Sequence, residues 1–290
     1  MGLPHAAWAL AVSPPVIEQE IGSGESVTKK ITLYNENVEP IIISWELRAI
    51  DKAKHNETGA PTILPPSEAV SAPLSWIELP KKPLTLSVGA HTELPITIRV
   101  PKGTEPGGYY GALLVGSQMS GKKGEVNIIG KTAIIILLTV RGNIKTEGVV
   151  KEFSLLPHEV SWLDHQPEGF VVRIENTGTV HFKPNGTVIV RSMVGTEDRL
   201  AINPAERSVL PAWTRRFEIP WSRNKTSAGI FGEWQRFGLG RYTANLAVQL
   251  GTHVVMQQIS YWVIPWRTLL ALVVLVAVII LAHKRHTSHK

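Results

Sequence analysis

Cysteine is absent from all 290 residues of the chain. Its absence excludes disulfide frameworks, thiolate zinc sites and cysteine nucleophiles, so folding must depend on hydrophobic cores. The chain also has no serine in a strand-to-helix nucleophile elbow and no spaced pair of carboxylates typical of an acid–base site. His158 and His165 lie near Glu159 and Asp164, but their spacing fits no standard metal-ligand pattern. We therefore predict no catalytic residue, no cofactor, no metal site and no enzyme activity.

A basic surface for nucleic acid is missing as well, although the formal net charge is +6. Residues 1–145 carry 14 Lys and Arg against 13 Asp and Glu, and residues 146–262 carry 12 against 11, so each part is only +1. The remaining basic residues are Arg267, Lys284, Arg285 and Lys290, which flank an apolar run. This distribution is typical of membrane flanks and excludes a nucleic-acid partner.

Helical periodicity is lacking between the two ends of the chain. Short apolar runs bounded by Gly, Pro, Asn and Asp recur instead, which is the pattern of an all-β sandwich. In "IIISWEL", alternation places Ile41, Ile43, Trp45 and Leu47 on one face of a strand, and we predict that Trp45 has a structural role in the core. Each half of the chain holds seven candidate strands, as an immunoglobulin-like sandwich requires.

The two halves resemble each other. "PGGYYGALLV" aligns with "LGRYTANLAV" so that Gly107 matches Gly240 and Tyr109 matches Tyr242. We predict two tandem immunoglobulin-like β-sandwich domains, at residues 12–145 and 146–262.

The glycines of "KGTEPGGYYGALLVG" raise the possibility of a phosphate loop. A phosphate loop needs a following helix and a Lys-Ser/Thr pair, whereas an alternating β pattern follows here. We interpret Gly107 and Gly108 as a turn that permits positive φ. Tyr109 and Tyr242 then occupy the place of a tyrosine corner, whose hydroxyl bonds to nearby backbone.

The C-terminal run Thr268–Ala282 contains no charge. We predict a transmembrane helix at residues 263–282, with Tyr261, Trp262 and Trp266 near one interface and a basic cytoplasmic tail at 283–290. The predicted location is a single-pass membrane protein with its bulk outside the cytoplasm and the lipid bilayer as a partner. A buried core helix is the alternative.

The N-terminus carries "AAWALAVSPP", with an Ala-x-Ala pattern at Ala9–Ala11 but no basic segment before it. We predict that residues 1–11 are a remnant of a secretory signal.

Two loop regions are candidate binding sites. The predicted topology places an aromatic and basic loop next to the membrane, which suits lipid headgroups, a partner or glycan surface, or plain packing. Its candidate residues are Trp221, Arg223, Phe231, Trp234 and Arg236. The same topology places a polar tip at the far end, where loops commonly bind ligands. Its candidate residues are Asn35, Glu36, Asn37, Lys122 and Lys123, and a solvated hairpin is the alternative.

The segments "ESVTKKITLYNENVEP" and "VPKGTEPGGYYGALLV", followed by a second sandwich, an apolar helix and a basic tail, resemble the WxL-interacting proteins of Gram-positive bacteria. The resemblance implies a peptidoglycan-binding sandwich and a partner-binding sandwich without catalysis.

Three hypotheses for function follow from these observations. The first is a membrane-anchored surface protein that binds cell-wall polymer or another surface protein. The second is a chaperone-like or assembly factor that offers sheet edges to exported subunits. The third is an accessory subunit of an envelope enzyme.

Overall fold

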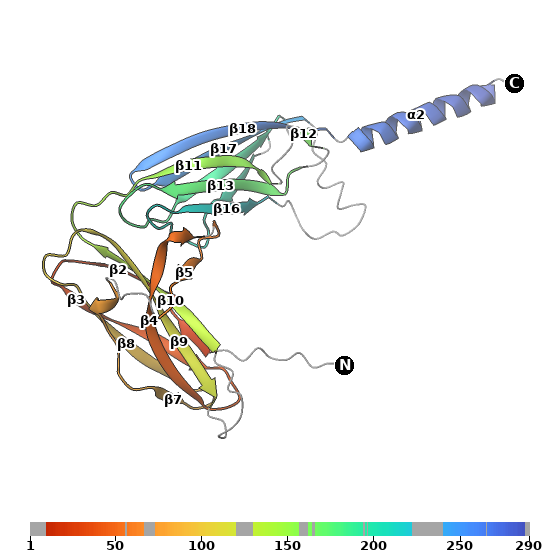
Figure 1. Ribbon diagram of the computed structural model, residues 1–290. Coiled ribbons are helices and arrows are strands. Elements are labelled where there is room, and N and C mark those ends of the chain that lie inside the picture. Colours follow the sequence, from red (N-terminus) through yellow and green to blue (C-terminus); the bar gives the residue numbers. More distant parts are fainter. Residues whose placement is uncertain are drawn as a thin grey trace. The chain divides into compact units, whose positions relative to one another are not determined.

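The computed structural model describes residues 10–55, 57–66, 73–119, 130–156, 162–163, 166–193, 195, 197–221, 240–264 and 266–287 (Figure 1). The chain clusters into two compact units. The first contains Met1–Thr146, Gly178–His181 and Leu210–Trp213, and the second contains Glu147–Thr177, Phe182–Val209 and Thr214–Lys290.

The first unit has two β-sheets. One sheet has the strand order β1 (Leu10–Ser13), β3 (Ser26–Asn35), β8 (His91–Arg99), β6 (Ile77–Glu78). The other has the order β2 (Val16–Ile21), β10 (Gly130–Val140), β9 (Gly107–Met119), β4 (Ile41–His55), β5 (Pro61–Ile63), and β7 (Leu84–Leu86) also pairs with β4. A short 3-10 helix, η1, covers Leu74–Trp76.

The first strand of this unit is divided between the two sheets. β1 runs antiparallel to β3, and after the cis peptide Ser13–Pro14 the chain continues as β2, which runs parallel to β10. Leu10 and Ala11 pair with Asn35 and Tyr34. Leu10 and Ala11, which fall in the signal remnant predicted at residues 1–11, are part of strand β1, while residues 1–9 lie outside the described part.

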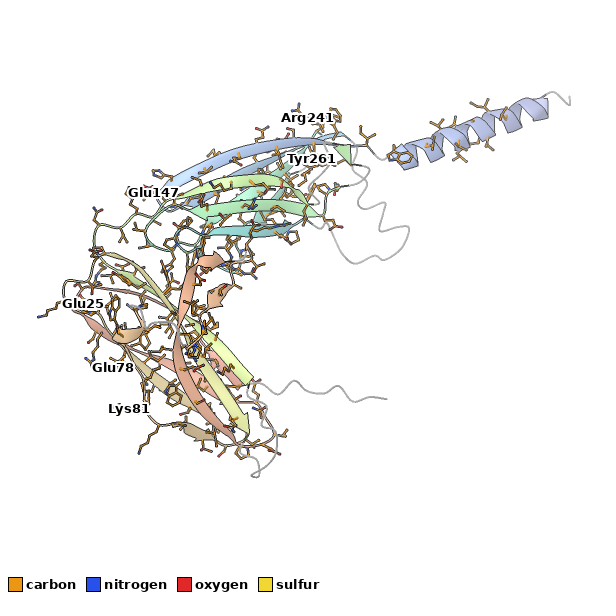
Figure 2. The ribbon with its side chains drawn as sticks, viewed as in Figure 1. Glu25, Glu78, Lys81, Glu147, Arg241 and Tyr261 are labelled. Carbon is orange, nitrogen blue, oxygen red and sulfur yellow. The ribbon has the colours of Figure 1, made fainter. Side chains whose placement is uncertain are left out.

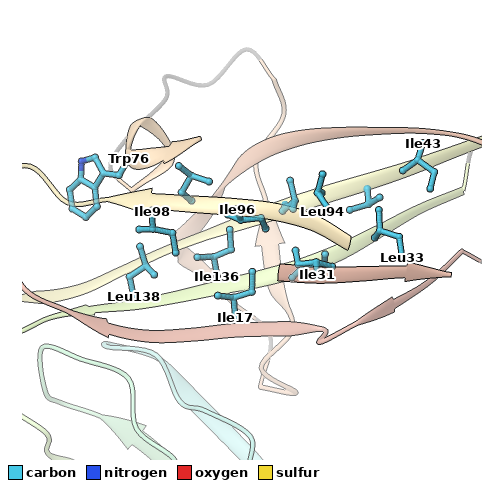
Figure 3. Close-up of a cluster of buried hydrophobic side chains, with 14 of the residues drawn as sticks. Ile17, Ile31, Leu33, Ile43, Trp76, Leu94, Ile96, Ile98, Ile136 and Leu138 are labelled. Carbon is cyan, nitrogen blue, oxygen red and sulfur yellow. The ribbon is translucent and has the colours of Figure 1, made fainter. Parts of the chain in front are cut away.

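The core of the first unit follows from strand alternation. The side chains of Ile31, Ile96, Ile136 and Leu138 are fully buried because every second residue of a strand faces the opposite sheet (Figure 3). Trp76 of η1 packs on this cluster, with its ring centroid 4.6 Å from that of Tyr109.

The inward face predicted for "IIISWEL" lies in β4. Ile41 and Ile43 are buried, whereas Trp45 and Leu47 are partly buried against the same cluster. The indole N–H of Trp45 donates a hydrogen bond to the carbonyl of Pro80 at 2.8 Å.

The second unit also has two β-sheets. One has the strand order β11 (Gly148–Leu156), β13 (Gly169–Asn176), β16 (Thr214–Pro220). The other has the order β12 (Trp162–Leu163), β18 (His253–Val263), β17 (Gly240–Leu250), β14 (Asn185–Ser192), β15 (Glu197–Ala201). Outside these strands, Val209 and Phe182 form an isolated antiparallel bridge.

The two units share one strand plan. In each, the first strand of one sheet is followed by a short strand that joins the other sheet parallel to its last strand: β2 beside β10, and β12 beside β18. In each, the last strand pairs antiparallel with a strand that begins at the predicted glycine, β9 at Gly107 and β17 at Gly240. The fold is thus mostly β and consists of immunoglobulin-like sandwiches.

Helix α2 covers Trp266–Thr287. Counting only the residues that the structure describes, no helix combines the length and the apolar composition needed to cross a membrane.

Candidate functional site

Strand β18 has a margin that no described strand covers along most of its length. On one side it pairs with β17 over its full extent, from His253 opposite Leu250 to Val263 opposite Gly240. On the other side β12 pairs only with Trp262 and Val263 (Figure 1). We call the uncovered margin, from Val254 to Ser260, the β18 edge.

The direction of the backbone groups at this edge follows from one hydrogen bond. The amide of Met193 donates to the carbonyl of Arg241 at 3.0 Å, so Arg241 and every second residue after it in β17 point their backbone groups toward β14. The intervening residues of β17 face β18 and form the hydrogen-bonded pairs of that ladder. Gln257 opposite Leu246 is one such pair.

Because consecutive residues of a strand alternate in direction, the even-numbered residues of β18 point the other way. Their N–H and C=O groups lie at the β18 edge, and no described residue bonds them in a strand ladder. These residues are Val254, Met256, Gln258 and Ser260. Such a row of unpaired donors and acceptors is a template for an added strand.

The side chains of this strand provide none of the features that normally protect an edge. His253–Val263 contains no Asp, Glu, Lys, Arg, Pro or Gly, and its register with β17 has no bulge. The outward side chains of Val254 and Met256 are 61% and 77% exposed, and Trp262 is 48% exposed. A long, uncharged and partly apolar edge favours association with another strand.

The other marginal strands of the chain carry protective features. β16 contains Arg215, Arg216 and Glu218 and ends at Pro220. β11 contains Lys151 and Glu152 with a register shift between Val150 and Glu152, and β15 begins with Glu-Asp-Arg. In the first unit, β2 contains two glutamates, and β1, β5, β6 and β7 have no more than four residues each. Compared with these marginal strands, the β18 edge is long and has no charged residue, proline or bulge.

An aromatic cluster lies at the end of β18 that β12 covers. Tyr261, labelled in Figure 2, stacks on Tyr242 with ring centroids 5.7 Å apart. Trp221 meets Tyr242 edge-on with ring centroids 6.0 Å apart. The hydroxyl of Tyr261 is buried and has no hydrogen-bond partner among the described residues. Burial raises the pKa of Tyr261, and the nearby Tyr242 and Asp198 raise it further. The cluster anchors one end of the strand and leaves the rest of the edge exposed.

The predicted polar tip consists in part of structural amides. Asn35 is 1% exposed, and its amide nitrogen donates to the carbonyls of Glu39, Leu86 and Ser87 at 3.0 Å. Its side-chain oxygen accepts from the backbone and side chain of Asn37, which is also buried. These amides fix the turn and leave little surface for a ligand. Glu36 is exposed, and Lys122 and Lys123 lie outside the described residues.

Of the aromatic and basic loop, the structure describes only Trp221. Trp221 is 6% exposed, and its indole N–H donates to the Asp198 carboxylate at 3.1 Å. Its ring packs 5.9 Å from that of Phe170. Trp221 therefore belongs to the core, since its ring has almost no exposed surface. Arg223, Phe231, Trp234 and Arg236 lie outside the described residues, as do His158 and His165.

The two candidate corner tyrosines differ. The hydroxyl of Tyr109 donates to the carbonyl of Glu105 at 3.0 Å, as a tyrosine corner does. The hydroxyl of Tyr242 instead accepts from the side-chain amide of Gln166 at 3.3 Å. At the preceding turn, Gly107 has a φ of 154°, and a Cβ on Gly108 would lie 2.0 Å from the hydroxyl oxygen of Tyr110.

No group of His, Asp and Glu within the described ranges is placed to hold a metal ion. The open edge of β18 was not among the candidate sites that the sequence suggested. The one available signal was composition, because an eleven-residue strand without a charged residue, proline or glycine is uncommon at a sheet margin.

Comparisons with known proteins give only weak similarity. No family model and no curated protein matches the chain. Among solved structures, the class 5 fimbriae chaperone CfaA has 11% identity and a TM-score of 0.42, with 86% of this chain and 98% of that chain covered. The E. coli chaperone DraB has 10% identity and a TM-score of 0.39, with 87% and 97% covered. A protein of unknown function from Porphyromonas gingivalis W83 has 14% identity and a TM-score of 0.32, with 88% and 99% covered. At these TM-scores the similarities assign neither a family nor a function to the chain.

Proposed function

We propose that this chain is a non-enzymatic binding protein of the assembly or chaperone-like type, which captures an extended segment of a partner protein by β-strand addition. The observation that carries the proposal is the β18 edge. Its backbone donors and acceptors are unpaired among the described residues, and it has no protective charge, proline or bulge.

The chemistry of the edge specifies the kind of occupant. A row of alternating N–H and C=O groups is matched by another extended backbone, and exposed side chains beside it select among sequences. The exposed side chains of Val254 and Met256 favour apolar side chains on the partner. A charged side chain on the partner would find no ion-pair partner in β18, because this strand contains no Asp, Glu, Lys or Arg. A polypeptide strand therefore suits this site better than a sugar polymer or a nucleic acid does.

The surface-protein hypothesis is compatible with this proposal when the bound partner is itself an envelope protein. Attachment to cell-wall polymer has no comparable support, because the tip amides Asn35 and Asn37 bond the chain itself. Membership of the WxL-interacting family remains a proposal supported by the "VPKGTEPGGYYGALLV" segment.

Anchoring to a membrane through α2, with the sandwiches outside the cytoplasm, is a further part of the proposal. Its support is the apolar run Val273–Leu281, in which every side chain is exposed. Fractionation of source cells tests it: the chain should stay with the membrane after a carbonate wash, and release by that wash would contradict it.

Capture of a partner by matched variants tests the proposed site. The full-length chain, Met256→Lys and Met193→Lys are each used to capture proteins from an envelope extract of the source cells. Met256 and Met193 are 77% and 70% exposed, so both lysines are compatible with folding, but only Met256 lies at the β18 edge.

We expect the native chain and Met193→Lys to capture the same partner, and Met256→Lys to bind it about tenfold more weakly because its ammonium group must lose water beside the added strand. In the complex, the amides of Val254, Met256, Gln258 and Ser260 should become protected from hydrogen exchange. Equal capture by all three chains, with these amides unprotected, would refute strand addition at β18.

A further inference from the structure

The last strands of the two units occupy equivalent places and can be compared residue by residue. β10 ends with Val140 opposite Gly107, and β18 ends with Val263 opposite Gly240. Aligning these pairs places Gln257 at the position of Ile134 and Ile259 at the position of Ile136. The comparison shows how the same edge is treated in each unit.

In the first unit a neighbouring strand covers the part of this edge that matches Gln258–Ser260. β2 pairs with β10 from Ile135 to Val140, whereas β12 pairs with β18 only at Trp262 and Val263. The described part of the second unit thus lacks the counterpart of most of β2.

Burial of the inward side chains follows this difference. Among the inward residues of β10, Ile134, Ile136, Leu138 and Val140 are fully buried, and Thr132, which matches Val255, is partly exposed. In β18 only Tyr261 and Val263, next to β12, are buried, while Val255, Gln257 and Ile259 are partly exposed. Among the residues that the structure describes, no strand covers the core of the second unit beside Gln257 and Ile259 as β2 does in the first unit.

The facing sheet is partly open at the same end. Glu147, immediately before β11, bridges to Gly251 in the turn before β18, so the beginning of β11 lies at the end of β18 that is far from β12 (Figure 2). Val149 is 40% exposed there and Val150 is partly exposed, whereas Phe153 and Leu155 farther along β11 are buried.

We infer that the partner segment completes this core: it is an uncharged extended strand whose apolar side chains, at every second position, insert between the sheets beside Gln257 and Ile259. This inference rests on the proposed function and specifies its ligand. Beside Gln258–Ser260 the added strand takes the place that β2 has beside Ile135–Leu137 in the first unit. A charged side chain on its inward face would lose water without a partner, and an apolar one would be buried.

A second copy of the chain fits this opening less well. In an antiparallel pair of two β18 strands, the second strand would bring its own Gln257 to the opening, where the first unit has fully buried isoleucines. An apolar strand from another protein supplies what the site lacks.

Two synthetic peptides test the inference on the full-length chain in mild detergent. One alternates valine with threonine, the other is threonine throughout, and both have the length of Val254–Ser260 with a lysine at each end. We expect the alternating peptide to bind about tenfold to a hundredfold more tightly, since each inserted valine buries an apolar side chain. It should also raise the melting temperature of the second unit, and Met256→Lys but not Met193→Lys should weaken its binding.

The outcomes separate the inference from the proposed function. If both peptides bind equally and protect the amides of Val254, Met256, Gln258 and Ser260, strand addition stands and core completion is wrong. If neither peptide protects these amides, both the inference and the proposed function are wrong. If the free chain dimerises and protects the same amides, the occupant is a second copy and the inference is overturned.

Discussion

Proline substitutions at two adjacent glutamines should have very different effects on the second unit. Gln257 is part of the ladder with β17, opposite Leu246, whereas the amide of Gln258 points to the β18 edge. Proline has no N–H, so Gln257→Pro removes a ladder hydrogen bond, and Gln258→Pro removes a donor that no described strand uses.

The difference in stability follows from the group left behind. Leu246 is 1% exposed, so the loss of its donor leaves a buried carbonyl without a partner, which costs about 1–3 kcal/mol beside the steric cost of the ring. Gln258→Pro only shifts the backbone angle φ of residue 258 from its extended value toward the value that the proline ring imposes, at a cost of about 1 kcal/mol. The two variants should differ by about 2 kcal/mol, or about 8 °C at roughly 4 °C per kcal/mol.

Scanning calorimetry of the full-length chain measures this difference, with the transition of the second unit assigned through the core variant Phe170→Ala. Gln258→Pro should melt close to the native chain yet fail to bind the alternating peptide. If Gln258→Pro is as destabilising as Gln257→Pro, the assigned direction of the backbone groups is incorrect, and with it the reasoning about the edge.

Two further pairs of variants test the packing. Tyr261→Phe should leave stability unchanged or raise it by about 1 kcal/mol, because it removes a buried hydroxyl that no described residue bonds, whereas Tyr242→Phe should lower stability by about 1 kcal/mol through loss of a hydrogen bond. Burial raises the pKa of the Tyr261 hydroxyl above its ordinary value of 10.0. The stability that depends on the neutral hydroxyl is therefore fully present below about pH 10 and is lost as the pH rises through the pKa of the folded state. Tyr261→Phe removes this titration, so the variant should unfold less at alkaline pH, as measured by circular dichroism. Gly108→Ala should destabilise the first unit by about 2 kcal/mol in urea unfolding, because the new Cβ would lie 2.0 Å from the hydroxyl oxygen of Tyr110. Gly130→Ala is the control and should be nearly neutral, because the nearest atom to its Cβ would be 3.6 Å away. Equal effects of the two variants would contradict the packing around Tyr110.

Local patterns predicted much of the fold correctly. Alternation identified the inward face of Ile41 and Ile43, and the two glycine-tyrosine motifs mark the starts of equivalent strands, β9 and β17. Both signals depend on residues close in sequence, where the period of a strand alone determines which side chains face the core.

Long-range pairing was the part that local patterns could not supply. Trp221 lies in a segment rich in aromatic and basic residues, and its burial depends on Asp198 and Phe170, which are distant in sequence. In the same way, the difference between β10 and β18 depends on how far β2 and β12 extend beside them. Whether a strand lies at the edge of a sheet depends on which other strands pair with it, and the strand's own residues indicate this only weakly.

Residue-resolved hydrogen exchange along β18, with and without the alternating peptide, tests the central claim most directly. In the free chain, the amides of Gln257 and Ile259 should exchange slowly and those of Met256 and Gln258 quickly. On binding, Met256 and Gln258 should become slow as well, which gives continuous protection along the strand. A free chain in which all four amides are already protected, or a complex in which Met256 and Gln258 remain fast, would contradict strand addition at this edge.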